Sequence, residues 1–284
     1  MNKAWIVTFV LSLLPLAASA APKAEVLKQV ESSMLVKGTI DIDTDGGVSS
    51  LAIDQADKFP GGLVGFVQKQ VKDWKFEPVV IEGKARRART PVSLRVVARK
   101  IDDDNYSIAI RNANFDGELP KEGESLSSKR LKPPHYPLSV ARSGATGTAY
   151  VVVKVDASGR VTDAIVEQVN LRTIGTTKEM ESWRAAMADA AVAAARSWTF
   201  IPPVVGEAAD DDFWSARVPV DFEMDIGRKF VYGKWEIYIP GPRQSIPWSK
   251  EDRPSFSPDS LAEGGVYMIG QDKGPKLLTV LDGT

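Results

Sequence analysis

The stretch DWKFEPVV at residues 73–80 ends an amphipathic segment, and its spacing returns as SWTFIPPVV at residues 197–205. Both stretches place a tryptophan, a phenylalanine and a proline at alternate positions, so an extended chain turns all three side chains to one side. These residues are Trp74, Phe76 and Pro78, and then Trp198, Phe200 and Pro202. Because burying an aromatic ring contributes roughly 2 to 3 kcal/mol, we expect both tryptophans to pack in a core. The recurrence predicts one structural unit that is used twice.

The segments before each motif also follow a common order. Residues 40–53 and 151–166 alternate apolar and polar side chains around a turn that contains Asp and Gly, which predicts a β-hairpin in each half. Apolar side chains at helical spacing follow over residues 63–74 and 180–198, which predicts a helix in each half. Each helix would end by bringing its tryptophan to the core face.

The segments after each motif complete the unit. Residues 88–97 and 216–225 share the pattern Arg-x-Pro-Val and alternate again, which predicts a strand in each half. Pro91 and Pro219 lack an N–H, so we expect them at a strand start or on a sheet edge. The predicted fold is therefore α+β, with two tandem domains that each pack helices on a small antiparallel sheet. We place these domains at residues 22–115 and 134–226, joined by a charged linker rich in Gly, Pro and Ser at residues 116–133.

The second half resembles the C-terminal domain of the TonB energy-transducer family over about residues 133–225. The motif residues that carry the resemblance are Pro134, Tyr136, Pro137, Ala141, Gly144, Gly147, Asp156, Gly159, Trp198, Phe200 and Pro202. The first half resembles a diverged copy. It keeps the Trp-x-Phe-x-Pro motif, whereas AEVLKQVESSM at residues 24–34 replaces the Pro-x-Tyr-Pro entry.

The resemblance implies a periplasmic domain whose last strand accepts a short peptide from an outer-membrane transporter by strand addition. The corresponding segment is residues 217–224, so Arg217, Val218, Asp221 and Glu223 are the candidate partner-binding residues. The expected partner is a protein of the cell envelope, with an outer-membrane receptor as the candidate. The expected function is involved in, or derived from, TonB-dependent outer-membrane transport. The alternative is a structural or scaffold protein of the envelope that reuses the domain without a transport role.

The N-terminal sequence predicts export. Residues 1–20 carry a basic Lys3, an apolar run and Ala-Ser-Ala, which is typical of a cleaved signal peptide and predicts a periplasmic protein. An uncleaved inner-membrane anchor is the alternative, although Pro15 interrupts a run shorter than the roughly 20 residues that span a bilayer. Residues 21–38 reach at most about 60 Å when fully extended, so we expect an adaptor without the long stalk of a full transducer.

Composition argues against several other classes of function. The 284 residues, at 43% hydrophobic and 26% charged with a pI near 6.0, lack the basic excess that a nucleic-acid-binding protein needs. There is no cysteine, so disulfides and thiolate sites are excluded. His135 is the only histidine, and no nucleophile motif accompanies it. We therefore expect a non-catalytic protein without a cofactor or a metal.

A calcium-like motif and the C-terminal tail remain to be interpreted. Asp41-x-Asp43-x-Asp45-Gly starts like a calcium-binding loop, but Ala52 stands where the bidentate Glu is required, which favours a solvated hairpin turn. In the second half, we align Asp156 with Asp45. The tail at residues 227–284 lies outside the resemblance. Its alternating stretches predict a β-rich extension, as either an added hairpin or an arm that contacts a partner.

Overall fold

The computed structural model describes residue 26 and residues 29–101, 106–115, 122–224, 231–249, 257–261, 265–270 and 274–281. The predicted signal peptide at residues 1–20 lies outside this part of the chain, as do residues 116–121 of the predicted linker. The architecture is α+β with antiparallel sheets, as the alternation and the helical stripes predict.

The first sheet is built from a long hairpin strand and a returning strand. Its strands are β1 (Glu31–Ile42), β2 (Val48–Ile53), β5 (Ala88–Lys100), β6 (Tyr106–Asn114) and β12 (Glu236–Tyr238). They follow the order β12-β1-β5-β6. Strand β2 pairs with the same edge of β1 as β12 does, but at the opposite end of that strand. The long β1–β5 ladder, from Ser32↔Ala98 to Ile42↔Ala88, makes β5 a central strand because β6 covers its other side.

One helix covers one face of the first sheet. Helix α2 (Leu63–Lys72) buries Leu63, Val67 and Val71, which recur at helical spacing, against apolar side chains of β1 and β5. The short elements η1 (Ala56–Lys58), β3 (Val80–Ile81) and β4 (Lys84–Ala85) complete this half.

The second sheet repeats the same connectivity. Its strands are β8 (Gly147–Asp156), β9 (Val161–Leu171), β11 (Phe213–Phe222) and β13 (Tyr267–Met268), in the order β13-β11-β8-β9. Strand β11 returns after the helix and pairs with the first strand of the hairpin, as β5 does in the first sheet. The edge of β5 carries β6, whereas the equivalent edge of β11 carries the two-residue strand β13 from the tail.

The helices of the second half are α3 (Leu138–Arg142) and α4 (Thr177–Ala195), and β7 (Ser127–Arg130) pairs with β10 (Thr199–Ile201) beside them. Helix α4 begins at a capping box in which Thr176 and Glu179 bond each other's backbone amides. Such a cap contributes about 1 kcal/mol.

The Trp-x-Phe-x-Pro motif performs one task in both halves. Trp74 and Trp198 are buried, and the amide of the following phenylalanine donates a 2.8 Å hydrogen bond to a turn glycine in each hairpin. Phe76 bonds the carbonyl of Gly46, and Phe200 bonds that of Gly159. Each motif thus fastens the end of a helix to the tip of the preceding hairpin.

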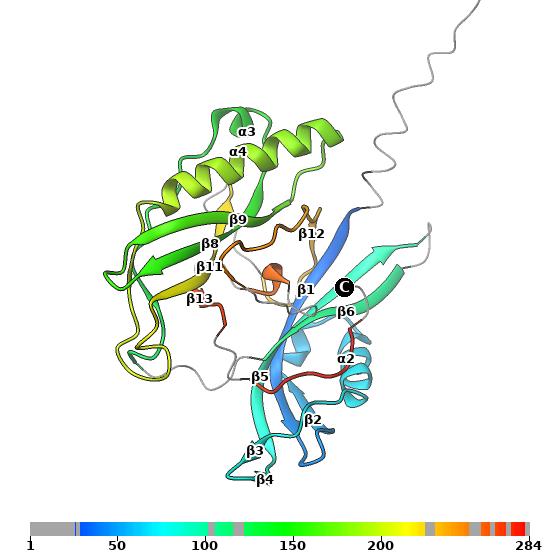
Figure 1. Cartoon of the computed structure of the whole chain (residues 1–284). Coiled ribbons are helices and arrows are strands. Elements are labelled where there is room, and N and C mark those ends of the chain that lie inside the picture. Colours follow the sequence, from blue (N-terminus) through cyan, green and yellow to red (C-terminus); the bar gives the residue numbers. More distant parts are fainter. Residues whose placement is uncertain are drawn as a thin grey trace, which may run out of the picture.

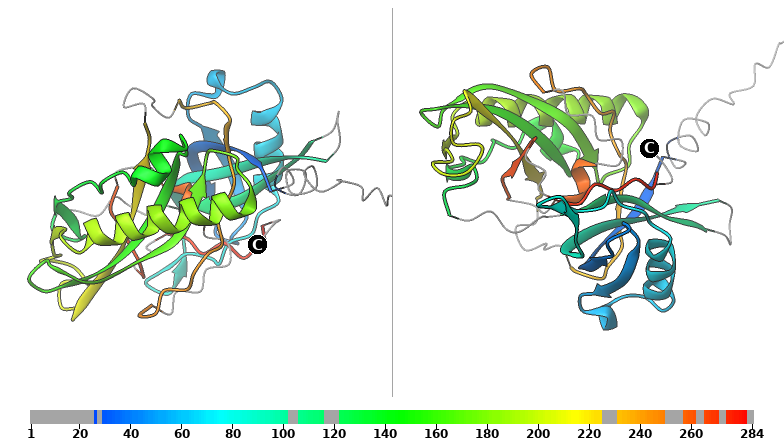
Figure 2. Two further views of the ribbon diagram at one scale, coloured as in Figure 1. Left: turned by 90° about the horizontal axis from the view of Figure 1, so that it is seen from above. Right: turned by 60° about the horizontal axis from the view of Figure 1, so that its bottom comes forward.

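The two sheets face each other across the tail. In the right-hand view of Figure 2, α4 lies on the outside of one sheet, α2 lies on the outside of the other, and the orange turn η2 (Pro258–Ser260) of the tail lies between the sheets. Figure 1 shows the same order from α4 through β8 and β12 to β5. Polar residues on the sheet faces opposite the helices meet here, including Ser33 and Arg95 from one sheet and Thr148 and Asn170 from the other. The two halves therefore pack together.

The described tail residues contain little strand, in contrast to the β-rich extension predicted from their alternation. Strand there is limited to β12 and β13, beside the single turn η2 (Pro258–Ser260). Pro240, Gly241, Pro242 and Pro247 interrupt regular pairing, so the chain bonds to sheet edges in short pieces. The described tail residues contact both halves, through β12 on β1 and β13 on β11, so they form neither a hairpin added to one domain nor an arm that stands apart from both.

Candidate functional site

The outer edge of β11 is the edge at which the resemblance predicts strand addition. One side of β11 pairs with β8 along the whole length from Phe213 to Phe222. On the other side, β13 pairs with Ala216 and Arg217. Within the described part of the chain, no strand pairs with this side of β11 at residues 218–222. The outer edge is therefore partly occupied by the chain's own tail.

The first two candidate residues have buried side chains. Arg217 is 2% exposed, and its Nε lies 2.7 Å from Oε2 of Glu167 on β9. Val218 is 3% exposed and belongs to the apolar core of the second sheet. Arg217 pairs with β13 at the outer edge, whereas Val218 pairs with Val151 of β8, and neither side chain lies on the surface.

The other two candidates lie together at the end of the strand. Asp221 and Glu223 both form ion pairs with Arg172, the latter at 3.5 Å, and Arg172 also donates to the Thr148 hydroxyl at 2.9 Å. Asp221 is exposed and Glu223 is half-buried. This end of the β11 edge therefore carries a charged cluster whose acids already have a cationic neighbour.

Glu167 links β11 to the tail. Its carboxylate is 1% exposed and accepts a bond from Arg217 as well as a 2.7 Å bond from Nε of Arg243. The backbone carbonyl of Glu167 also accepts from the amide of Gln244 at 2.8 Å. Two cations around one buried carboxylate hold this part of the tail against the outer edge of β9.

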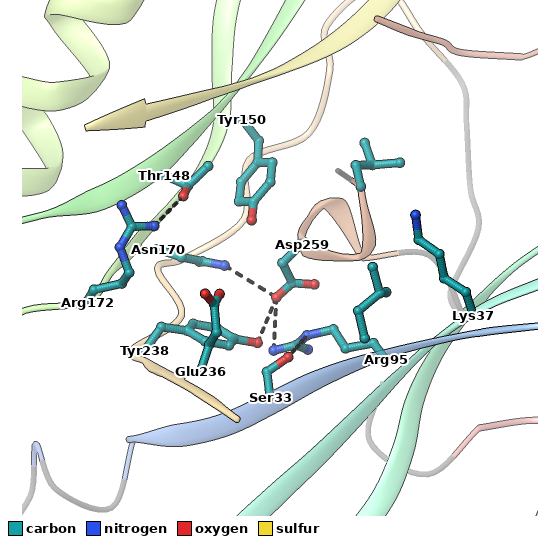
Figure 3. Close-up of a pocket in the computed structure, with 12 residues that line it drawn as sticks. Ser33, Lys37, Arg95, Thr148, Tyr150, Asn170, Arg172, Glu236, Tyr238 and Asp259 are labelled. Carbon is teal, nitrogen blue, oxygen red and sulfur yellow. Dashed lines mark hydrogen bonds and ion pairs between the residues drawn. The ribbon is translucent and has the colours of Figure 1, made fainter. Parts of the chain in front are cut away.

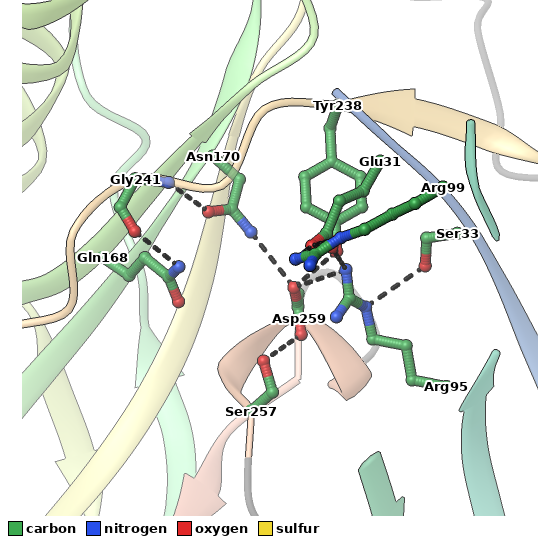
Figure 4. A network of polar contacts seen from close by, with 10 residues as sticks. All are labelled: Glu31, Ser33, Arg95, Arg99, Gln168, Asn170, Tyr238, Gly241, Ser257 and Asp259. Carbon is green, nitrogen blue, oxygen red and sulfur yellow. Dashed lines mark hydrogen bonds and ion pairs between the residues drawn. The ribbon is translucent and has the colours of Figure 1, made fainter. Parts of the chain in front are cut away.

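A second polar cluster, which we call the junction cluster, lies where both sheets and the tail meet (Figure 4). Glu31 of β1 accepts from Arg95 at 3.1 Å and from Arg99, both on β5. From the tail, Asp259 lies 3.0 Å from Arg95 and accepts from the Tyr238 hydroxyl at 2.8 Å. Two carboxylates and two guanidinium groups thus balance in charge where the strands and the tail converge.

The second sheet also contributes to the junction cluster. Asn170 of β9 donates to Asp259 at 3.3 Å, and its carbonyl oxygen accepts from the Gly241 amide at 3.1 Å. The Arg95 guanidinium lies 4.8 Å from the centre of the Tyr238 ring. Burial raises the pKa of the Asp259 carboxyl, whereas the Arg95 charge acts in the opposite direction. The cluster joins all three parts of the molecule.

A cavity of about 300 Å³ adjoins the junction cluster (Figure 3). Both sheets and the tail line it, with Lys37, Arg95, Tyr150, Asn170, Tyr238 and Asp259 among the lining residues. The Arg95 and Arg172 side chains at its wall already form ion pairs with acids. The cavity is therefore a polar space between the sheets that tail residues close on one side.

The acidic hairpin of the first half pairs each of its aspartates with a different cation. Asp41 bonds Arg89 at 2.6 Å, Asp43 pairs with Arg87 at 3.0 Å, and Asp45 lies 3.4 Å from Lys75. Among the described residues, no group of three or more acidic or histidine side chains could hold a metal ion.

The turn geometry also corrects the sequence alignment of the two hairpins. The amide of Gly46 bonds the carbonyl of Asp43, and that of Gly159 bonds the carbonyl of Asp156. Asp156 is thus equivalent to Asp43, and not to Asp45 as the residue spacing suggested.

The ion pair at Asp41 yields a pH prediction. Hydrogen bonds from Arg89 and then Ser50 lower the pKa of Asp41 to about 2, so the stability that this pair contributes is present above the unfolded value of 3.8 and is lost as the pH falls toward 2. We expect Arg89→Leu to raise the pKa of Asp41 toward 3.8, as measured by NMR titration of its carboxyl carbon. The matched variant Arg87→Leu should leave that pKa in place, and an equal rise in both variants would contradict the assignment.

The remaining motif residues have structural positions. The Tyr136 hydroxyl donates to the Ala145 carbonyl at 2.6 Å, and its ring packs edge-on against Phe222. Burial is the largest cause of the raised pKa of Tyr136. Pro134 is half-buried, Pro137 precedes α3, and Gly144 follows α3 with a φ of 64°. None of these residues lies in the junction cluster.

Gly147 and the two motif prolines complete the set. A side chain at Gly147 would meet the Asn170 carbonyl at 2.4 Å, so the strands β8 and β9 approach closely there. Pro202 is half-buried beside the Gly159 turn, whereas Pro78 is exposed. His135 is exposed as well.

Sequence reasoning did not identify the residues of the junction cluster. Alternation over residues 88–97 correctly places Arg95 opposite the core, but it does not show what covers that face of the sheet. The sequence does show several polar residues on that face. Glu31, Ser33 and Arg95 come together as a patch only when β1 pairs with β5, so their proximity is not visible in the sequence.

Comparison with known proteins supports one part of the sequence interpretation. The chain is 36% identical over 101 residues to Protein TonB of Xanthomonas campestris pv. campestris (strain B100), a match that covers 35% of this chain and 39% of that protein. It is 34% identical over 92 residues to Protein tonB2 of Pseudomonas aeruginosa, covering 32% of this chain and 29% of that protein. The chain thus matches less than half the length of these curated relatives. The similarity supports a TonB-like C-terminal domain in this chain.

No family model matches the chain, and no solved structure gives a significant match. In the part of the chain that the structure describes, none of the helices combines the length and the apolar character needed to cross a bilayer.

Proposed function

We propose that this chain is a periplasmic, non-catalytic TonB-like protein that binds an envelope protein by strand addition at the outer edge of β11. The observation that carries the proposal is the similarity to proteins named TonB, combined with an outer edge of β11 that is only partly paired. Strand addition needs such an edge because backbone bonds supply most of the affinity. The partner would be an outer-membrane receptor, and the signal peptide at residues 1–20 would deliver the protein to the periplasm.

We further propose that the chain contains two TonB-like domains, at residues 22–115 and 134–226, with residues 116–133 as the linker. Two observations support this proposal: the strand connectivity is repeated, and a phenylalanine-to-glycine backbone bond fastens each hairpin. In the first half, β6 pairs with the equivalent edge of β5. We therefore assign partner binding to the second half.

The proposal can be tested with a proline at Asp221. In an antiparallel sheet, alternate residues direct their backbone groups to opposite sides, and Ser215 directs its carbonyl to the outer edge of β11. Residue 221 has the same parity, so Asp221→Pro removes an outward donor and leaves the bonds to β8 intact. We expect this variant to recover about tenfold less outer-membrane receptor than the wild-type chain in a pull-down from envelope extract.

The matched control is Asp221→Ala, which removes the ion pair with Arg172 but keeps the backbone donor. Equal recovery by the wild-type chain and Asp221→Pro would overturn strand addition at residues 218–222 of this edge. Recovery of cell-wall or scaffold components without a receptor would favour the alternative function, an envelope scaffold. The tail that joins both halves favours that alternative specifically, because it gives the molecule a fixed internal geometry.

A further inference from the structure

The tail segment at residues 265–270 lies on the edge that the proposed partner would use. The amide of Ile269 donates to the Ser215 carbonyl at 2.8 Å, and the antiparallel register continues through Met268 opposite Ala216 and Tyr267 opposite Arg217. A strand from the chain itself therefore already extends this sheet.

The tail pairs with the part of the β11 edge whose outward backbone donors and acceptors are all available. Since Ser215 bonds outward, alternation places Arg217 as the next outward residue and Pro219 as the one after it. Proline has no N–H, so pairing beyond Arg217 loses a donor. A partner strand would make its most complete ladder at residues 215–217, where the tail segment lies.

The side chains of the segment show what the edge accepts. Val266 and Met268 pack against the apolar core of the second sheet. Ile269 is buried on the opposite face of the sheet, against Val152 and beside Trp248. The edge thus takes an apolar residue, the half-buried Tyr267, and then two apolar residues, with support on both faces of the sheet.

We infer that residues 266–269 are an internal occupant of the partner site, and that the partner is an extended peptide with this same apolar-x-apolar-apolar pattern. The inference rests on the proposed function, and it adds that tail and partner exclude each other. The paired strand β13 spans two residues, and each backbone hydrogen bond contributes only about 1 kcal/mol net, so a peptide can displace the segment while the junction cluster holds the rest of the tail.

A reversible disulfide tests the inference in the full chain. Ala216 and Met268 form a non-hydrogen-bonded pair, where Cα atoms lie about 4.5 Å apart, within the range that a disulfide needs. Because the chain has no cysteine, Ala216→Cys with Met268→Cys introduces the only thiols. The probe is a synthetic peptide with the sequence of residues 265–270, GVYMIG, whose binding is followed by NMR shifts of the residue 215–217 amides.

We expect the reduced double variant to bind the peptide at least about tenfold more tightly than its oxidised form. The single variant Ile269→Pro, which removes the donor to Ser215, should bind the peptide more tightly than the matched variant Ile269→Val. Equal peptide binding by the oxidised and reduced forms, with Ile269→Pro no different from Ile269→Val, would overturn the inference.

Receptor capture separates this inference from the proposed function. If the reduced form binds the peptide but neither form captures a receptor, the tail occupies a peptide site and the proposed function fails. If both forms capture the receptor equally, the proposed function stands and the competition with the tail is wrong.

Discussion

Replacing Gly159 with alanine is expected to lower the free energy of unfolding by about 3 kcal/mol, because backbone strain and overpacking each cost about 1 to 3 kcal/mol. Gly159 has a φ of 77°, and a Cβ at this position would lie 2.1 Å from the Phe200 carbonyl oxygen. That oxygen cannot easily move away, since the Phe200 amide is bonded to the Gly159 carbonyl at 2.8 Å. Urea unfolding followed by tryptophan fluorescence measures the loss.

Gly144 supplies the matched control. Its φ of 64° is also left-handed, but a Cβ there would meet no atom within 4 Å. Gly144→Ala should therefore show the backbone strain alone, about 1 kcal/mol. Equal losses from the two variants would contradict the steric contact between hairpin and motif.

The same test applies to the first half. A Cβ at Gly46 would lie 2.0 Å from the Phe76 carbonyl, at a φ of 79°. Gly46→Ala should therefore destabilise the protein about as much as Gly159→Ala, by about 3 kcal/mol. A small effect at Gly46 would indicate that the two motifs are not equivalent.

Local periodicity predicted much of this fold. The α+β class, both hairpins, the helices α2 and α4 and the returning strands β5 and β11 follow from spacings of two and of three to four residues. These patterns are robust because each element buries one face, and a shift of one residue in a strand would expose its whole apolar set.

Periodicity could not predict what covers the other face of each sheet. Alternation shows that Arg95 lies opposite the core, but it does not show whether water or protein meets this side chain. The tail bonds through isolated residues, such as Ile239 to Leu171 and Ile269 to Ser215, and single contacts leave no periodic signal. The junction cluster and the occupied edge of β11 therefore became visible only in three dimensions.

Replacing Glu31 with glutamine is expected to lower the free energy of unfolding by about 3 to 5 kcal/mol, as for other buried ion pairs that lose one partner. The Glu31 side chain is 5% exposed and neutralises two guanidinium groups, Arg95 and Arg99. Glutamine keeps the shape of the side chain but removes its negative charge. The buried cluster around Arg95, whose side chain is also 5% exposed, then carries an excess positive charge. Urea unfolding at neutral pH measures the loss.

The same substitution at an exposed pair is the control. Glu77 lies 3.2 Å from Lys276, with side chains 59% and 74% exposed, so Glu77→Gln should change the free energy of unfolding by less than about 1 kcal/mol. A comparable loss of free energy of unfolding at both sites would show that burial does not increase the contribution of the Glu31 ion pairs to stability.

Charge balance distinguishes the ion-pair explanation from simple loss of packing. In Glu31→Gln, the cluster keeps two cations and the one carboxylate of Asp259. Adding Arg99→Gln restores the balance, with Arg95 still 3.0 Å from Asp259. We expect the double variant to be more stable than the sum of the two single losses predicts, by about 1 kcal/mol or more. Strict additivity would mean that shape, and not charge, holds the tail between the two sheets.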